Sequence, residues 1–341
     1  MSLTTTQMQM LRNSCSVLAS VRQEDDEQAW LAVRTNGIGG SDVGAICGVN
    51  KWASARQIYF RKVGQYQDET EPNEAAVERM HFGHMLEPVV AQEFANRYQD
   101  IYCLEADCTF KSNEHPYLLA NVDRFVIDKC TDEIIGILEC KTANENMNDE
   151  WRGGEVPMSY YYQVQHYLFV TGLEHAWISC LVGGNKFYTY DIFFDRDLYT
   201  NVILPQLHSF WFDCVLKLQE PPVQSADSEF FDSLFTVDNL DNTPIDIVDE
   251  DIDNIGDKLT ELKTQKKELE KEIEECKAKI KEQLQEHTVG RSPKYEFKWS
   301  PRTRTSVDTG RLRMEYPEIY AECINTVSYR QLSIKKVSTD D

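Results

Sequence analysis

Residues 115–141 read HPYLLANVDRFVIDKCTDEIIGILECK, and this stretch predicts a β-hairpin at the centre of the fold. Residues 118–128 and 134–141 are rich in β-branched and aliphatic side chains, which favour strands. The polar residues KCTDE between them favour a turn. We therefore expect two neighbouring antiparallel strands joined by a short connection.

The register of this hairpin predicts which charged side chains meet. If the turn is centred on its middle residue, Asp128 pairs with Ile134, and counting back along both strands places Asp123 opposite Glu139. Because side chains alternate across a strand, Glu139 and Lys141 share one face, while their immediate neighbours point to the other. Two carboxylates and one ammonium group therefore converge at one place.

Like charges that converge beside apolar strands repel one another unless a cation neutralises them. A divalent metal would do so, and hard carboxylate oxygens suit Mg²⁺ or Mn²⁺. A neighbouring lysine could then orient or deprotonate an attacking water. The spacing D-x15-E-x-K is a loose pattern, and an exposed hairpin with a surface cluster of Asp, Glu and Lys explains it equally well.

The composition is that of a globular protein with an excess of acidic residues. The chain has 341 residues and a formal charge of −22, so any contact with nucleic acid must be made by locally clustered basic residues. Its ten cysteines contain no CxxC pair, which disfavours zinc ribbons and disulfide frameworks. No apolar run has the length of a membrane span, and we expect a cytoplasmic protein, or a nuclear one in a eukaryotic host.

Changes in composition along the chain predict five segments. These are an N-terminal arm over residues 1–27, a core over 28–218, an acidic linker over 219–257, a coiled-coil helix over 258–287 and a basic appendage over 288–341. The linker lacks Lys and Arg, and the next segment repeats apolar residues with heptad spacing. That seam predicts either a coiled coil or one long helix packed on the body.

The basic appendage reverses the charge of the rest of the chain. Residues 290–336 carry ten Lys or Arg against five acidic residues, and Tyr295, Phe297 and Trp299 alternate among them. Basic groups interleaved with aromatic rings suit single-stranded nucleic acid or a duplex backbone. A small hairpin packed on the coil explains the same pattern.

A glycine-rich turn precedes another predicted helix. Gly37, Gly39 and Gly40 lead into Ser41 and Asp42, which are candidates for the N-cap of a helix over residues 43–47. Free N–H groups at such a position can bind an anion. An ordinary tight turn before a helix is the alternative.

Five blocks of sequence, taken in order, resemble one family. They are GIGGSDVGAICG at 37–48, HFGHMLEPVVAQEF at 81–94, LLANVDRFV at 118–126, GILECKTA at 136–143 and VPMSYYYQVQHYLFVTGLEHAWI at 156–178. Together they resemble the YqaJ-type viral recombinases, relatives of phage lambda exonuclease within the PD-(D/E)XK nuclease superfamily. The resemblance implies an α/β fold in which a mixed central sheet is flanked by helices. We expect a long C-terminal helix or coiled coil and a small basic appendage to follow this nuclease core.

The resemblance also assigns a metal site. Asp123, Glu139 and the backbone carbonyl of Cys140 would hold one Mg²⁺, or Mn²⁺, and Glu87 would help to hold a second. Two ions per site are therefore expected.

Other roles in the site follow from the same resemblance. Lys141 would position and activate the attacking water, and Gln163 would orient Lys141 or the water. Arg34 and Ser41 match the arginine and serine that bind the 5′ phosphate of DNA in this family.

The activity implied is a 5′→3′ exonuclease on double-stranded DNA that leaves 3′ single strands for recombination. Relatives form rings around DNA and work with a single-strand annealing protein, so both a homo-oligomer and such a partner are expected. Three alternatives remain from the residues. They are a single-strand or endonucleolytic DNase with the same core, a non-catalytic DNA-binding scaffold, and a coiled-coil assembly protein without a DNA role.

Overall fold

A computed structural model describes residues 3–20, 26–64, 74–106, 108–235, 240, 243–249, 251–326 and 328–335 of the chain. The chain divides into two units, Met1–Leu234 and Phe235–Asp341. Within the described ranges, no helix combines the length and the apolar character needed to cross a bilayer.

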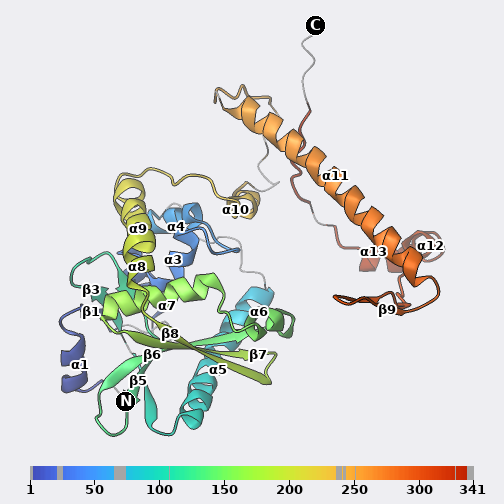
Figure 1. Ribbon diagram of the computed structural model, residues 1–341. Helices are drawn as coiled ribbons and strands as arrows, with labels where there is room; N and C mark the ends of the chain where they lie inside the picture. The colour runs from blue at the N-terminus through green and yellow to red at the C-terminus, as the bar shows by residue number, and fades with distance from the viewer. Residues whose placement is uncertain are drawn as a thin grey trace. The chain divides into compact units, whose positions relative to one another are not determined.

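A five-stranded mixed sheet lies at the centre of the N-terminal unit (Figure 1). In spatial order its strands are β2 (Ile101–Glu105), β5 (Arg124–Asp128), β6 (Ile134–Ala143), β7 (His175–Val182) and β8 (Lys186–Phe193). All neighbours are antiparallel except β6 and β7, which are parallel and therefore need a crossover. Helix α7 (Met158–Thr171) supplies that crossover. The mixed sheet with flanking helices confirms the predicted fold class.

Strands β5 and β6 form the predicted hairpin, with one correction near the turn. The structure pairs Ile127, not Asp128, with Ile134. Asp128 is turned into the connection instead, where its Oδ1 accepts hydrogen bonds from the N–H groups of Cys130 and Thr131, both at 2.8 Å. The side chain thus stabilises the turn, as aspartate commonly does at the first position of a turn.

A bulge restores the predicted register at the far end of the hairpin. The register shifts by one residue just after the turn, and Arg124 then pairs with Leu138. Extending that pairing by one residue brings Asp123 beside Glu139. The predicted juxtaposition is therefore reached through a bulge.

Helices α5 (Glu74–Arg97) and α7 cover opposite faces of the sheet (Figure 1). Phe94 of α5 packs with Leu138 of β6, whereas Val164 of α7 belongs to the cluster that contains Ile137. Helix α5 continues through Pro88. Because odd and even residues of β6 face different helices, Glu139 and Lys141 point toward α7.

Residues 3–20 form a short helix and a strand that pack on the core. Helix α1 (Thr5–Leu11) leads into β1 (Cys15–Ala19). Strand β1 begins a second sheet, in the order β1, β3 (Thr109–Ser112) and β4 (Leu119–Ala120). Leu11 and Cys15 are buried in the main core, and this burial of apolar surface holds the segment in place.

Shorter helices complete the N-terminal unit. They are α2 (Glu27–Thr35), α3 (Gly40–Ile46), α4 (Ala55–Lys62), α6 (Asn148–Arg152), α8 (Arg196–Leu198), α9 (Leu204–Ser209) and α10 (Asp227–Leu234), with π-helical turns at Tyr199–Ile203 and Phe210–Val215. Helix α10 falls inside the segment predicted as an acidic linker. Its Phe230 is buried, with the ring centroid 5.7 Å from that of Phe60 in α4, so this part of the segment docks on the core.

The C-terminal unit is built on helix α11 (Ile252–Leu284). Strands β9 (Val289–Arg291) and β10 (Glu296–Lys298) form a hairpin, and helices α12 (Thr309–Glu315) and α13 (Pro317–Cys323) follow. Helix α11 overlaps the predicted coiled-coil segment over residues 258–287, but it begins at Ile252 and ends at Leu284. In the single chain, Leu262, Leu269 and Ile273 of its apolar seam are 47%, 58% and 51% exposed.

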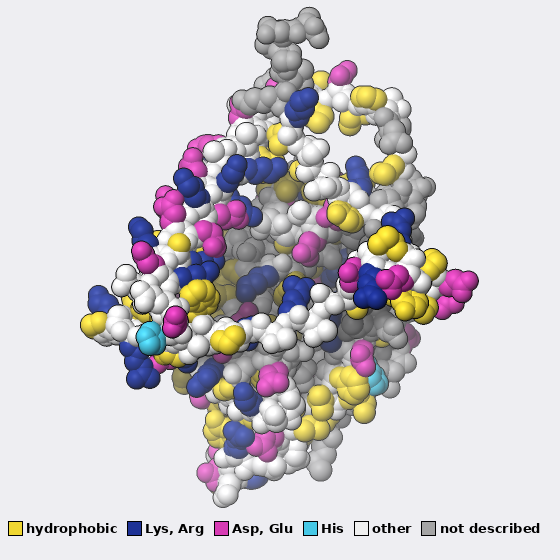
Figure 2. Space-filling model, turned by 90° about the vertical axis from the view of Figure 1, so that its right-hand side faces the viewer, with side chains coloured by type: hydrophobic (Ala, Val, Ile, Leu, Met, Phe, Trp, Pro, Cys, Tyr) yellow, Lys and Arg dark blue, Asp and Glu magenta, His cyan; other side chains and the backbone are white. Residues whose placement is uncertain are grey.

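Cationic and anionic side chains are interspersed over the face of the molecule shown in Figure 2. On α11, Lys266 lies 3.9 Å from Glu270, and Lys271 lies 3.8 Å from Glu275, as expected of a solvated helix surface. The face in view therefore carries mixed charge and no continuous basic band.

His166 of α7 is a completely buried histidine. One ring nitrogen lies 2.9 Å from the hydroxyl of Tyr199, and the other lies 3.0 Å from the carbonyl oxygen of Leu119. Burial lowers the pKa of His166 from 6.5 to about 4. The residue is therefore neutral in the folded protein at pH 7.

We expect the free energy of unfolding to fall as the pH drops from about 6.5 to about 4. In this window the unfolded chain binds a proton at His166 that the folded chain does not, so stability that is complete above pH 6.5 is lost as the pH falls. The pKa shift of His166 corresponds to roughly 3 kcal/mol of the free energy of unfolding. Urea titrations from pH 4 to 7 should show a flatter pH dependence for His166→Gln, and parallel curves would contradict the assignment.

Candidate active site

All eight residues that the sequence singles out line one cavity of about 570 Å³ in the N-terminal unit. They are Arg34, Ser41, Glu87, Asp123, Glu139, Cys140, Lys141 and Gln163. Helices α2, α3, α5 and α7 and strand β6 contribute to its wall. Residues far apart in the sequence are thus gathered around one concave space, which is the usual setting of an active site.

Glu139 is the most deeply buried carboxylate of this cavity, at 1% exposure. Its Oε1 accepts hydrogen bonds from Lys141 Nζ at 2.6 Å and from Gln163 Nε2 at 2.7 Å. The same amide nitrogen lies 3.0 Å from the hydroxyl of Tyr167, and Lys141 Nζ lies 4.9 Å from the ring centroid of Tyr160. Gln163 therefore orients Glu139, whereas the resemblance implies that it orients Lys141 or water.

Asp123 lies directly before β5, beside the strand β6. Its Oδ2 accepts a hydrogen bond from the N–H of Cys140 at 2.8 Å. This bond takes the place of a backbone hydrogen bond between the two strands. The N–H and C=O of one strand residue point toward the same neighbouring strand. The Cys140 carbonyl is therefore directed to the edge where Asp123 lies, next to Glu139.

The oxygens at this edge fit a divalent cation. Oε2 of Glu139 is buried and accepts no hydrogen bond within the described part of the chain, which is costly for a carboxylate oxygen that has no cation near it. Carboxylate and carbonyl oxygens are the ligands that Mg²⁺ and Mn²⁺ prefer. Among the described residues, no group of three or more Asp, Glu, His and Cys side chains is arranged to hold an ion by itself. The candidate ligands here are two carboxylates and a backbone carbonyl.

Burial and mutual repulsion perturb the acids of the cavity. Burial, followed by the charge of Asp123, raises the pKa of Glu139 to about 8 and that of Glu87 to about 7. Burial disfavours the charged form of Lys141, but the charges of Glu139 and Asp123 outweigh it and raise the pKa of the ammonium group. The site therefore contains repulsion that a cation would relieve.

Arg124 is a residue of the site that the sequence analysis missed. It precedes Phe125 on β5, and its guanidinium is on the α5 side of the sheet, where Nη1 donates to Glu87 Oε1 at 2.6 Å. Nη1 also lies 2.6 Å from the backbone oxygen of Asp123. The sequence did contain a sign of this role. An arginine directly follows the candidate metal ligand Asp123 in an otherwise apolar strand, where a charge without a partner is unfavourable.

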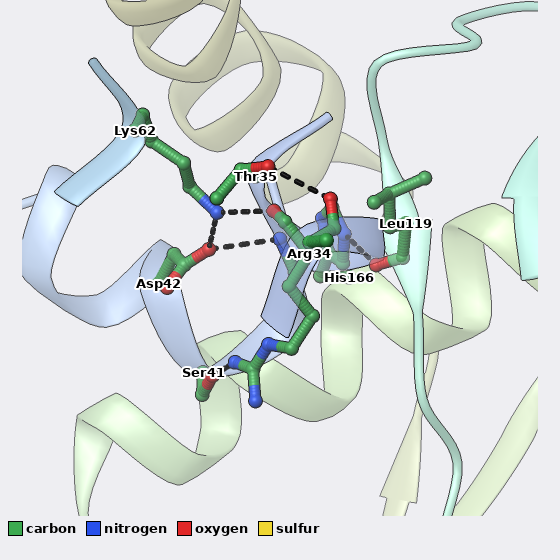
Figure 3. A network of polar contacts seen from close by, with 9 residues as sticks. Arg34, Thr35, Ser41, Asp42, Lys62, Leu119 and His166 are labelled. Carbon is green, nitrogen blue, oxygen red and sulfur yellow. Dashed lines mark hydrogen bonds and ion pairs between the residues drawn. The ribbon is translucent and has the colours of Figure 1, made fainter. Parts of the chain in front are cut away.

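Arg34 and Ser41 meet at one side of the cavity (Figure 3). Arg34 Nη2 donates a hydrogen bond to the hydroxyl of Ser41. Behind them, Lys62 Nζ lies 2.8 Å from the carboxylate of Asp42 and donates to the backbone oxygen of Arg34 at 2.7 Å. Lys62, which the sequence analysis also missed, thus braces the backbone that carries Arg34.

The start of α3 differs from the prediction. Its N-cap is Gly39 rather than Ser41 or Asp42, and the carboxylate of Asp42 reaches back to the N–H of Gly39 at 3.0 Å. Burial raises the pKa of Asp42, but the charges of Lys62 and Arg34 outweigh it, and the pKa lies below its usual range. Asp42 is therefore an ionised structural brace.

Comparison with known proteins identifies relatives of the chain. Residues 29–174 match the model of the YqaJ-like viral recombinase domain. The uncharacterized protein YqaJ of Bacillus subtilis (strain 168) is 32% identical over 333 residues, which cover 96% of this chain and 100% of that protein.

Two solved structures show weaker likeness. An alkaline exonuclease from Laribacter hongkongensis is 19% identical, with a TM-score of 0.45 over 56% of this chain and 94% of its own. A phage-related exonuclease from Haemophilus somnus 129PT is 12% identical, with a TM-score of 0.39 over 54% of this chain and 96% of its own.

Proposed function

The chain belongs to the family of YqaJ-like viral recombinases, and we propose that it is a metal-dependent nuclease for DNA recombination. It would degrade one strand of duplex DNA from the 5′ end and leave a 3′ single-stranded tail. The observation that carries the proposal is the meeting of Asp123, Glu139 and Lys141 in one cavity, with a buried Glu139 oxygen that accepts no hydrogen bond from the described residues.

Asp123, Glu139 and the Cys140 carbonyl would hold a Mg²⁺ or Mn²⁺ ion. When bound, such an ion polarises the scissile phosphate and acidifies a water. Lys141 has an ammonium group held 2.6 Å from Glu139, and its remaining N–H donors would hold the attacking water or a phosphate oxygen. Gln163 would keep Glu139 in one orientation through its 2.7 Å hydrogen bond. Glu87, which the family resemblance assigns to a second ion, could reach such an ion only by leaving Arg124.

The test uses linear duplex DNA with 5′ phosphates, incubated with Mg²⁺ and, in parallel, with Mg²⁺ and EDTA. We expect 5′ mononucleotides and 3′ tails that form only without EDTA, and we expect covalently closed circular DNA to stay intact. Cleavage of the circle would favour an endonuclease. DNA binding without cleavage would favour the scaffold alternative.

The direction of digestion would be set by a phosphate pocket at Arg34. Its guanidinium can contact two phosphate oxygens, and the Ser41 hydroxyl beside it offers a further hydrogen bond. A terminal phosphate carries more charge than an internal one, so the pocket should favour a phosphorylated 5′ end. Hydrolysis itself looks the same from either end of a strand and cannot define the polarity.

Arg34→Ala should remove most of the preference for 5′-phosphorylated over 5′-hydroxyl duplex, a difference of roughly 1.5 to 3 kcal/mol. Initial rates on the two duplexes, for wild type and variant, measure it. Arg61→Ala, which changes an exposed arginine of α4 next to the brace Lys62, is the control and should keep the preference. If the wild type ignores the 5′ phosphate or begins at 3′ ends, the pocket and the direction are both wrong.

We also propose a ring-like homo-oligomer that acts on DNA ends together with a single-strand annealing protein. Family membership supports this assembly, and so does the exposed seam of α11, which could join subunits. The C-terminal unit, with its basic appendage, would contact DNA or the annealing protein.

A further inference from the structure

We infer that Arg124 limits the active site to one tightly bound divalent cation, because its guanidinium holds Glu87 away from the other metal ligands. The inference rests on the proposed function, since it concerns the metal ions of the nuclease. It differs from the expectation of two ions that the family resemblance raises.

The geometry separates two groups of side chains. Asp123 and Glu139 belong to the side of the sheet that α7 covers, whereas Arg124 and Glu87 meet on the side of α5. Arg124 follows Asp123 directly in sequence, and adjacent residues of a strand point to opposite faces. Glu87 therefore approaches the ligand set from the α5 side of the sheet, where it is bound by Arg124.

The contact between Arg124 and Glu87 is a partly buried, charge-assisted hydrogen bond. Nη1 lies 2.6 Å from Glu87 Oε1 and 2.6 Å from the backbone oxygen of Asp123, and the residue is 8% exposed. Arg124 is also opposite Glu105 in the pairing of β2 and β5. Removing Glu87 from a guanidinium held in this way would leave a buried positive charge with less compensation, which is unfavourable.

The charges of the cavity lead to the same conclusion. The cavity is lined by four carboxylates, Glu87, Glu105, Asp123 and Glu139, and by four cationic groups, Arg34, Arg79, Arg124 and Lys141, so their formal charges balance. Each divalent ion that binds therefore adds net positive charge. A second ion would be repelled by the first and by Arg124, and it would compete with Arg124 for Glu87.

The test counts Mn²⁺ ions bound to the full-length protein without DNA, by electron paramagnetic resonance of free Mn²⁺ during titration. We expect one tight ion in the wild type. Arg124→Met keeps an unbranched apolar stem but frees Glu87. The affinity for a second Mn²⁺ ion should therefore rise by about 10-fold or more. Arg124→Lys, which retains the positive charge, is the matched control and should still bind one tight Mn²⁺ ion.

Glu87→Gln provides a second, independent measurement. In the wild-type background it should leave the tight ion unchanged, because Glu87 is not among its ligands, and in the Arg124→Met background it should abolish the gain. Two tight ions in the wild type, loss of tight Mn²⁺ in Glu87→Gln, or no gain in a folded Arg124→Met would each overturn the inference. If Arg124→Met proves unfolded by circular dichroism, the wild-type count and Glu87→Gln decide.

Results that would contradict the proposed function differ from results that would contradict only the role of Arg124. Asp123→Asn should lose the tight ion, because it removes a predicted ligand. A wild-type protein that binds no Mn²⁺ tightly would overturn the metal-dependent nuclease itself. One tight ion in both the wild type and a folded Arg124→Met would overturn only the role of Arg124.

Discussion

Glu139→Gln should abolish DNA cleavage, by about 10³-fold or more, while the fold remains intact. Glutamine has the same shape as glutamate, and its amide oxygen can still accept the hydrogen bonds that Lys141 and Gln163 make at 2.6 and 2.7 Å. The atom that replaces Oε2 becomes an NH₂ group, which cannot bind a metal. The metal-binding atom is therefore lost while the packing is kept.

Asp123→Asn should have the same effect on cleavage and should also stabilise the metal-free protein. Asp123 is a principal cause of the raised pKa of both Glu139 and Glu87, so removing its charge relieves repulsion on both. The amide oxygen of asparagine can still accept the hydrogen bond from the N–H of Cys140, which Asp123 Oδ2 accepts at 2.8 Å in the wild type. Thermal melting in EDTA should therefore give an unchanged or higher Tm.

The control for both variants is Glu133→Gln, which alters an exposed carboxylate at the turn of the same hairpin. It should cleave at the wild-type rate. Digestion of linear duplex at saturating Mg²⁺, followed as release of acid-soluble nucleotide, measures all three variants. Wild-type activity in either site variant would remove that residue from the metal site.

Lys141→Met should lower turnover by about 10²-fold or more and leave Mn²⁺ binding in place. The methionine keeps most of the apolar stem of lysine but has no ammonium group to contact Glu139, water or phosphate. Lys141 itself is not a metal ligand in the proposed site. The expected loss is therefore in the chemical step.

Single-turnover digestion separates that step from DNA binding, and Mn²⁺ titration of the same protein reports the metal. The control is Lys186→Met at the exposed start of β8, which should change neither quantity. If Lys141→Met fails to bind Mn²⁺, the residue holds the ligands in place and has no direct part in the reaction.

Periodicity along the chain was sufficient to predict the central hairpin and the face of its charged residues. Alternation within a strand depends on backbone geometry alone, so Glu139 and Lys141 could be placed together without knowledge of any neighbour. The family resemblance then connected them with Glu87, Gln163 and Arg34. The cavity gathers all of these side chains.

The turn shows where local pattern was insufficient. Counting from the centre of the connection pairs Asp128 with Ile134, but the side chain of Asp128 binds two N–H groups of the turn, and Ile127 lies opposite Ile134. A bulge restores the register before Asp123. Side-chain hydrogen bonds within a turn compete with strand pairing. The spacing of apolar residues does not predict the outcome of that competition.

Only the tertiary structure decided which distant groups hold the site residues. Arg124 meets Glu87 because α5 packs on the face of the sheet to which Arg124 points, and Lys62 braces the backbone of Arg34 because α4 packs beside α3. Each contact joins elements whose relative position depends on the packing of the whole core, and no periodicity of a single segment encodes it. The sequence by itself therefore determined the hairpin and the reactive groups on it, while packing determined the charges that surround them.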